Sequence, residues 1–245
     1  MIEARQIQKR YANFQAVHPL DLDVGDGEIF GFLGLNGAGK TTTLRMLAGV
    51  LPPTGGTIQI DGISLEKDPV EARRRMGFIP DRPYLYDKLT AREFLHFLGN
   101  LYGMDRRTLA GRADEVLKEQ DLLEMGDALV EGFSHGMKQR LTLAGALMHR
   151  PRLLIVDEPM VGLDPKGTKQ IKRTFRDLAR EGRTVFLSTH TLDVAAEVCD
   201  RLAIVHKGKI ARIGTPKELV PAGLTLEDVF LSVTGGEQGE PERED

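Results

Sequence analysis

The chain has 245 residues, of which 41% are hydrophobic, and a formal net charge of −3. A chain of this size can bury a substantial core, so disorder is excluded for most of its length. The weakly acidic balance gives no global positive field, so nucleic acid is not an expected partner. Cys199 is the one cysteine; it cannot form an internal disulfide and is predicted to be a buried structural thiol.

No apolar run reaches the roughly 18–20 residues that a membrane-spanning helix requires. Residues 1–6 also lack the apolar core of a secretory signal. We therefore expect a cytoplasmic chain that does not cross a membrane by itself.

Short apolar runs alternate with turns in residues 1–30 and again around residues 58–62. This pattern predicts β-hairpins, and hence an antiparallel sheet near the N-terminus.

Residues 34–41 read Gly-Leu-Asn-Gly-Ala-Gly-Lys-Thr and match G-x-x-x-x-G-K-[ST] at every fixed position. A strand-like run, residues 29–33, precedes them, and a plausible helix, residues 42–47, follows. In this motif the glycines bring backbone N–H groups close to a polyphosphate, the lysine reaches the β- and γ-phosphates, and the hydroxyl ligates Mg²⁺. We predict a site that binds and hydrolyses ATP or GTP. Its residues are Asn36, Gly37, Ala38, Gly39, Lys40, Thr41 and Thr42.

Residues 82–150 are rich in helical pattern and poor in β-branched residues, which predicts an inserted helical subdomain. Thr90 and Glu93 have the spacing of a capping box, and apolar residues recur behind them at helical spacing. Residues 105–120 and 135–149 predict two more helices.

Three later apolar runs, residues 153–156, 184–188 and 202–205, are short and nearly continuous. Such runs are typical of parallel strands that helices cover on both faces. The predicted fold class is α/β, with a mostly parallel sheet, an N-terminal antiparallel β subdomain and the inserted helical subdomain. Residues 234–245 are predicted to form a disordered acidic tail.

Asp157 and Glu158 directly follow the first of these runs, so they lie at the carboxyl end of a buried strand, where ligands of α/β sheets bind. We predict that Asp157 belongs to the magnesium shell and that Glu158 orients or deprotonates an attacking water. The alternative is an acidic pair at a helix N-terminus. His190 also follows a predicted strand and is expected at the same edge, where it can contact the γ-phosphate. Taken alone, a histidine at a strand end is more commonly a helix cap or a solvated side chain.

Residues 134–141, Ser-His-Gly-Met-Lys-Gln-Arg-Leu, resemble the signature motif of ATP-binding cassette (ABC) ATPases. Several further motifs match in the order that this family has, over residues 2–233. Residues 34–42 resemble Walker A, residues 153–157 resemble Walker B, and residues 162–164 resemble the D-loop. The resemblance implies that Tyr11 stacks on adenine, that Glu158 is the catalytic glutamate and that His190 is the switch histidine. Lys40 completes the predicted catalytic set.

Ser134 is a good N-cap, and a helix N-terminus offers free N–H groups to an anion. In the family this end grips the γ-phosphate of ATP on a second subunit, so the resemblance implies a dimer with ATP and Mg²⁺ as ligands. Ser134, Gly136 and Asp164 would then complete the partner's site. The implied organisation is one ABC ATPase domain, residues 1–233, with a core at residues 1–81 and 151–233 and a helical subdomain at residues 82–150.

The chain departs from the family pattern at three places. His135 and Met137 replace the usual glycine and glutamine of the signature. Asp81 stands where the Q-loop has a glutamine, and we predict it as a metal ligand because Mg²⁺ prefers anionic oxygen. Residues 160–162 alter the D-loop. Whether His135 contacts phosphate or only fills space is left open.

Transport would require a separate membrane permease, which residues 82–104 would meet on the cytoplasmic face of the membrane. Tyr84 and Tyr86, beside the Q-loop position, fit such a surface, although both could instead pack inside the domain. The signature, Asp81 and residues 226–231 together resemble export-type cassettes. The alternative function is a non-transport ABC ATPase that acts on nucleic acid or ribosomes. The substrate, the direction of transport and the choice between homodimer and heterodimer stay open.

Overall fold

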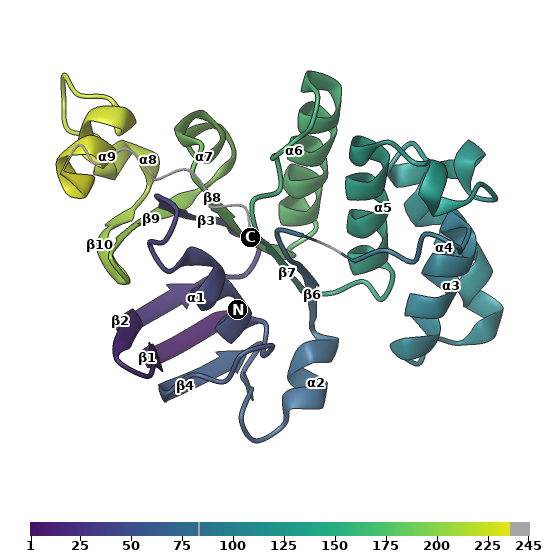
Figure 1. The fold of residues 1–245 in the computed structure, drawn as a ribbon, viewed down its shortest axis with the longest axis horizontal. Helices are drawn as coiled ribbons and strands as arrows, with labels where there is room; N and C mark the ends of the chain where they lie inside the picture. Colours follow the sequence, from purple (N-terminus) through teal and green to yellow (C-terminus); the bar gives the residue numbers. More distant parts are fainter. Residues whose placement is uncertain (83, 236–245) are drawn as a thin grey trace.

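A six-stranded sheet runs through the middle of the protein in the order β10-β9-β3-β8-β7-β6 (Figure 1). All its strands are parallel except β10, which pairs antiparallel with β9 at one edge. The computed structural model describes residues 1–82 and 84–235. The strands are β3 (Ile29–Gly34), β6 (Met76–Ile79), β7 (Leu153–Val156), β8 (Thr184–Thr189), β9 (Arg201–His206) and β10 (Lys209–Gly214).

The central strands are fully buried and largely apolar because both faces of this sheet are covered. In β7, Leu153 and Ile155 pack into one hydrophobic cluster, whereas Leu154 and Val156 pack into another on the opposite face. All four side chains are buried. This alternation explains why the sequence shows continuous rather than period-two hydrophobicity, and it confirms the predicted parallel α/β core.

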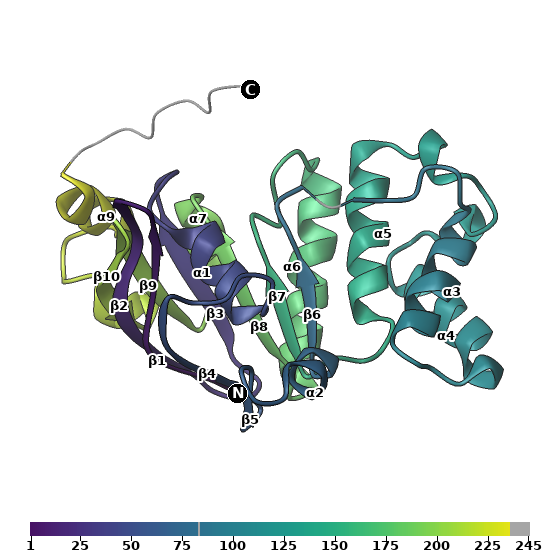
Figure 2. The ribbon, with the colours of Figure 1, turned by 60° about the horizontal axis from the view of Figure 1, so that its bottom comes forward.

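An antiparallel sheet in the order β2-β1-β4-β5 occupies the N-terminal part of the fold, as the hairpin pattern predicted. Helix α1 (Lys40–Leu47) packs with this sheet and with one face of the parallel sheet, burying Leu44, Met46 and Leu47 in the cluster that they share (Figure 2). The strands are β1 (Ile2–Tyr11), β2 (Phe14–Val24), β4 (Gly55–Ile60) and β5 (Ile63–Ser64), and the short helix α2 (Pro69–Arg74) leads from β5 to β6.

The predicted helical insert forms a separate group of helices at the far end of the molecule from the antiparallel sheet (Figures 1 and 2). Its helices are α3 (Ala91–Leu101), α4 (Arg106–Glu119) and α5 (His135–Leu147), with 3₁₀ turns at Leu123–Met125 and Val130–Gly132. The capping box between Thr90 and Glu93 is present at the start of α3. The three predicted helices are therefore confirmed.

The remaining helices are α6 (Pro165–Arg180), α7 (Leu192–Val198), α8 (Pro216–Leu219) and α9 (Leu226–Thr234). Cys199 is buried, as predicted, and its burial raises the pKa of the thiol to about 12. The predicted tail lies outside the described residues from residue 236 onward, and its first residue, Thr234, instead ends α9 with a buried side chain. Within the described part of the chain, none of the helices is long and apolar enough to cross a membrane.

Candidate functional site

The phosphate-binding loop joins β3 to α1 at the carboxyl edge of the parallel sheet. Gly37 and Gly39 adopt φ of 77° and 96°, in the left-handed region that glycine tolerates best. A Cβ atom at Gly39 would also lie 2.7 Å from the carbonyl oxygen of Ala16, so no larger residue fits there. The loop borders a hollow of about 730 Å³. The predicted site residues that line it are Tyr11, Asn36, Gly37, Gly39, Lys40, Thr41, Thr42, Asp81, Glu158 and His190.

The three predicted catalytic side chains meet in this hollow. Lys40 Nζ lies 3.3 Å from Glu158 Oε1, and His190 Nδ1 lies 3.0 Å from Glu158 Oε2. The same lysine donates hydrogen bonds to the carbonyl oxygens of Gly34 at 2.8 Å and Leu35 at 3.2 Å. Lys40 is 6% exposed and Glu158 is 12% exposed. A weakly solvated carboxylate between a cation and an imidazole can hold a water and receive its proton.

Asp157 is nearly buried at the end of β7, with 2% of its side chain exposed. Its Oδ1 accepts a hydrogen bond from the Ser188 hydroxyl, whereas no donor among the described residues reaches Oδ2. A buried carboxylate oxygen without a donor is costly unless a cation or water satisfies it. The described residues contain no cluster of three or more His, Cys, Asp or Glu side chains suited to a metal. Oδ2 of Asp157 is available to a cation or a water, and Thr41 lines the hollow.

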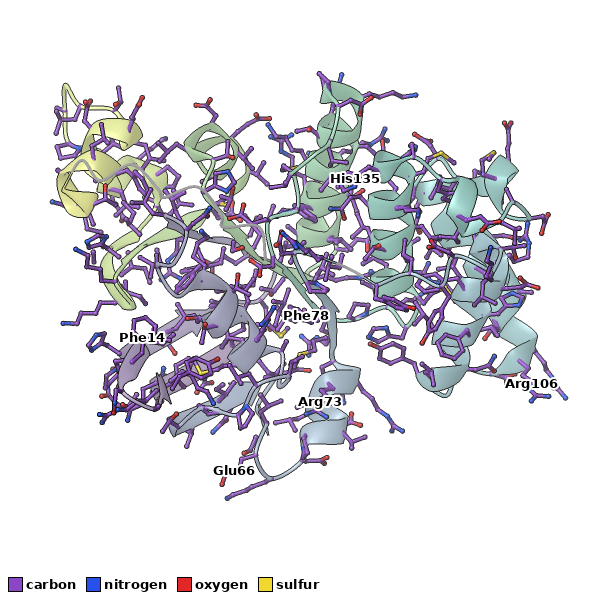
Figure 3. The ribbon with its side chains drawn as sticks, viewed as in Figure 1. Phe14, Glu66, Arg73, Phe78, Arg106 and His135 are labelled. Carbon is purple, nitrogen blue, oxygen red and sulfur yellow. The ribbon has the colours of Figure 1, made fainter. Side chains whose placement is uncertain are left out.

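Two aromatic rings stand at the hairpin end of the hollow. Tyr11 ends β1 and is 46% exposed, and Lys9 Nζ lies 5.4 Å from the centre of its ring. Phe14 begins β2, pairs with Tyr11 across the hairpin and is 64% exposed (Figure 3). Both rings line the hollow. Phe14 was not predicted as a site residue, although its position beside a two-residue turn opposite Tyr11 would have indicated it.

The signature and D-loop residues line a second hollow of about 320 Å³, between the N-termini of α5 and α6. The Ser134 hydroxyl caps α5 by accepting from the Met137 N–H at 3.3 Å, and the Asp164 carboxylate caps α6 by accepting from the Gly167 N–H at 2.7 Å. Ser134, Gly136 and Asp164 border this second hollow and do not line the first. The structure therefore divides most of the predicted site residues into two groups, whereas Ala38 and Asp157 line neither hollow.

Two of the departures from the family pattern contact each other. His135, at the first turn of α5 (Figure 3), packs against Gly162 of the D-loop, where a Cβ atom would lie 2.7 Å from the imidazole Nε2. Gly162 also has φ of 73°. The His135 imidazole thus occupies the space that a side chain at position 162 would fill. Whether His135 also contacts phosphate stays open.

Residues 17–161 match the ABC transporter family, and the chain belongs to that family. It is 43% identical over 211 residues to the bacitracin transport ATP-binding protein BcrA of Bacillus licheniformis, covering 86% of this chain and 68% of that protein. It is 39% identical over 219 residues to the linearmycin resistance ATP-binding protein LnrL of Bacillus subtilis, covering 89% of this chain and 70% of that protein.

A solved ATP-binding subunit of an ABC transporter superposes with a TM-score of 0.87 at 30% identity, covering 95% of this chain and 99% of that one. A second neighbour is a dimeric ATP-binding cassette in a post-hydrolysis state with ADP and Pi bound; it has a TM-score of 0.80 at 28% identity and covers 88% of this chain and 98% of that one. The chain is an ATP-binding and ATP-hydrolysing subunit of an ABC transporter, as the resemblance implied. The relatives do not support the alternative of an ATPase that acts on nucleic acid or ribosomes.

Proposed function

We propose that the chain powers export as one of two ATPase subunits that drive a separate membrane permease. The observation that carries this proposal is the division of the site residues between two hollows. The phosphate loop, Glu158 and His190 line one, whereas Ser134 and Gly136 line the other. One chain therefore offers two incomplete phosphate sites, which two chains facing head to tail would convert into two complete ones.

In this proposal Asp157 and Thr41 bind Mg²⁺, which, when bound, neutralises charge on the phosphate oxygens. The N–H groups of the loop and the Lys40 ammonium hold the β- and γ-phosphates of ATP. Glu158 holds the attacking water and takes its proton, and His190 fixes one oxygen of that carboxylate at 3.0 Å. Asp81 lines the same hollow, and we propose it as a further oxygen ligand reached directly or through water.

The second subunit would supply Ser134, Gly136 and Asp164 to complete the site. The N-terminus of α5 presents free N–H groups to an anion, with Ser134 capping the helix. The dimeric neighbour with ADP and Pi supports a dimeric working form by similarity. We propose the arrangement of one ATPase domain, residues 1–233, with residues 82–150 as its helical subdomain.

An exposed aromatic patch beside Asp81 is the proposed permease surface. Tyr84 is 81% exposed, Tyr86 is 44% exposed and Phe97 is 38% exposed. The Tyr86 ring contacts the rings of Tyr84 and Phe97 edge-on, at 5.5 Å and 5.3 Å between centroids. The two tyrosines therefore do not pack inside the domain, and aromatic side chains are enriched in protein interfaces. A protein docked here would hold the chain on the cytoplasmic face of the membrane.

Export rests on the relatives, since one of them is a Nod factor export ATP-binding protein of Cupriavidus metallidurans, 36% identical over 244 residues. The test is copurification from detergent-solubilised membranes of the native host. We expect the wild-type chain to retain a membrane protein with several apolar spans, and Tyr84→Ser with Phe97→Ser to lose it. Leu231→Ser removes a comparably exposed apolar side chain elsewhere and should retain it. Equal retention by both variants would contradict the proposed surface.

A further inference from the structure

Ser188 is a buried hydroxyl in an otherwise apolar stretch of β8, and it contacts both carboxylate residues of the site. Its side chain has no exposed surface. The hydroxyl donates to Asp157 Oδ1 and accepts the backbone N–H of Glu158 at 3.1 Å. The Ser188 hydroxyl thus donates to Asp157, the proposed cation ligand, and accepts from Glu158, the proposed catalytic residue.

The backbone at Glu158 needs such support. Glu158 has φ of 48°, in the left-handed region, a conformation that a residue other than glycine keeps only where its surroundings hold it. Among the described residues, the Ser188 oxygen is the side-chain acceptor of its N–H. This turn, immediately after β7, is what brings the Glu158 carboxylate to Lys40 and His190.

The orientation of the Asp157 carboxylate is fixed by the same group. Oδ1 accepts the hydrogen bond from Ser188, whereas no donor among the described residues reaches Oδ2. Rotation about the terminal bond of an aspartate is otherwise broad. The serine therefore decides which oxygen of Asp157 remains available to a cation.

We propose that Ser188 is a positioning residue that sets the cation-binding oxygen of Asp157 and the turn of Glu158 together. Without the hydroxyl, the carboxylate loses its fixed rotation, and the Glu158 N–H loses its acceptor. Both the affinity for the cation and the rate of hydrolysis then fall. This inference rests on the proposed magnesium site, so its test measures magnesium binding separately from turnover.

The chain supplies a matched control on the same strand. Thr184, at the other end of β8, is equally buried, and its hydroxyl also donates once and accepts once, to the Gly25 carbonyl at 2.9 Å and from the Gly27 N–H at 3.1 Å. Thr184 lies away from the carboxylates. Thr184→Val therefore removes a comparable pair of hydrogen bonds and reports the purely structural cost of losing a buried hydroxyl.

The experiment compares Ser188→Ala and Thr184→Val in the full chain, using calorimetry with ADP, with and without Mg²⁺, and steady-state ATPase kinetics. For Ser188→Ala we expect ADP affinity without Mg²⁺ to stay unchanged, and the Mg²⁺ concentration for half-maximal hydrolysis to rise about tenfold, with a similar fall in kcat. Thr184→Val should keep the wild-type Mg²⁺ requirement even if its Tm falls as far as that of Ser188→Ala.

An unchanged Mg²⁺ requirement and kcat in Ser188→Ala would overturn the role of Ser188. Equal changes in both variants would also overturn it, since they would reflect strand stability alone. A wild-type chain whose ADP affinity does not depend on Mg²⁺ would overturn the magnesium site itself, and with it this inference. Calorimetry of the wild-type chain thus tests the magnesium site itself, whereas the comparison of the two variants tests the role of Ser188.

Discussion

The two phosphate-binding regions of the chain differ in how far the chain itself fixes their geometry. In the first, Lys40 and Asp157 are almost fully buried at the edge of the parallel sheet, and Glu158 contacts both Lys40 and His190. In the second, Ser134 and His135 are exposed at the start of one helix. The first region is prearranged by strand ends that converge, whereas the second is an open surface suited to a ligand held elsewhere.

The two regions also differ in where the free energy of binding comes from. Side chains held by packing and several contacts keep their orientation before a ligand arrives, so binding orders few groups. An exposed helix N-terminus gains most of its interaction energy when a partner excludes water from it. The first region should therefore control chemistry within one chain, and the second should control association between chains.

Glu158→Gln tests the first half of this comparison and carries the largest expected effect. The amide cannot accept the proton of the attacking water, so hydrolysis should fall by a factor of about 10² to 10⁴, while the size of the side chain is kept. Affinity for ATP should stay within a few-fold, and an ATP-bound dimer should accumulate. Phosphate release and light scattering measure the two results.

Glu131→Gln is the control for that substitution, because it changes an exposed carboxylate that pairs with Lys88. It should leave the rate of hydrolysis unaltered. If steady-state hydrolysis by Glu158→Gln equals that of the wild type, Glu158 is not the catalytic carboxylate.

Ser134→Ala tests the second half. Made in the Glu158→Gln background, it should weaken ATP-dependent dimerisation about tenfold, because the serine oxygen and the helix end that it caps form the proposed contact to the partner's phosphate. ATP affinity of the monomer, measured by calorimetry at low protein concentration, should not change. If the ATP affinity of the monomer falls instead, Ser134 contacts the nucleotide bound to its own chain.

A cap substitution also destabilises its helix, so Thr90→Ala serves as the matched control. Thr90 caps α3 through the same kind of side-chain bond, from the Glu93 N–H at 3.2 Å. Both variants should lose about 1 kcal/mol of stability, and dimerisation should respond only to Ser134→Ala.

The same contrast separates what the sequence could predict from what it could not. Residues 34–41 follow a local motif, and the capping box at Thr90 is also local, so the loop and the helix appear where they were expected. The sharing of one hollow by Glu158 and His190 followed from the rule that parallel strands end at a common edge. Local patterns and one topological rule were sufficient for these features.

Contacts between segments far apart in the chain were beyond such rules. The contact of His135 with Gly162 depends on how α5 and the D-loop approach, and no spacing in the sequence encodes that distance. The link from Ser188 to Asp157 is similar, because the register of β8 against β7 decides which hydroxyl meets the carboxylate. Phe14 differs from these, since the hairpin that pairs it with Tyr11 is local in sequence.

The signature helix is attached to the parallel sheet at its other end, where His149 follows α5. Its imidazole Nε2 lies 3.0 Å from the Met76 carbonyl oxygen of β6, and its ring stacks on Tyr102 with 3.6 Å between centroids. Since a carbonyl only accepts, Nε2 donates this bond. The pKa of His149 is lowered to about 4, chiefly by burial; the hydrogen bond to Met76 opposes this shift, and the neighbouring Arg112 contributes to it.

This histidine predicts a loss of stability in mild acid. The unfolded chain binds a proton at His149 below about pH 6.5, whereas the folded chain stays neutral there until about pH 4. Because the unfolded state then binds more protons, stability is complete above pH 6.5 and falls as the pH falls from 6.5 to 4. At pH 5 the expected loss from this one group is roughly 1 to 2 kcal/mol relative to pH 7.5.

Urea unfolding at pH 7.5 and pH 5 measures that loss, and His149→Gln supplies the comparison because glutamine does not titrate. Carboxylates contribute equally to both proteins, so the difference between their two pH responses isolates the histidine. The variant should be less stable than the wild type at pH 7.5 and should lose less on acidification. Identical pH responses would mean that His149 is not held neutral at the junction of α5 and β6.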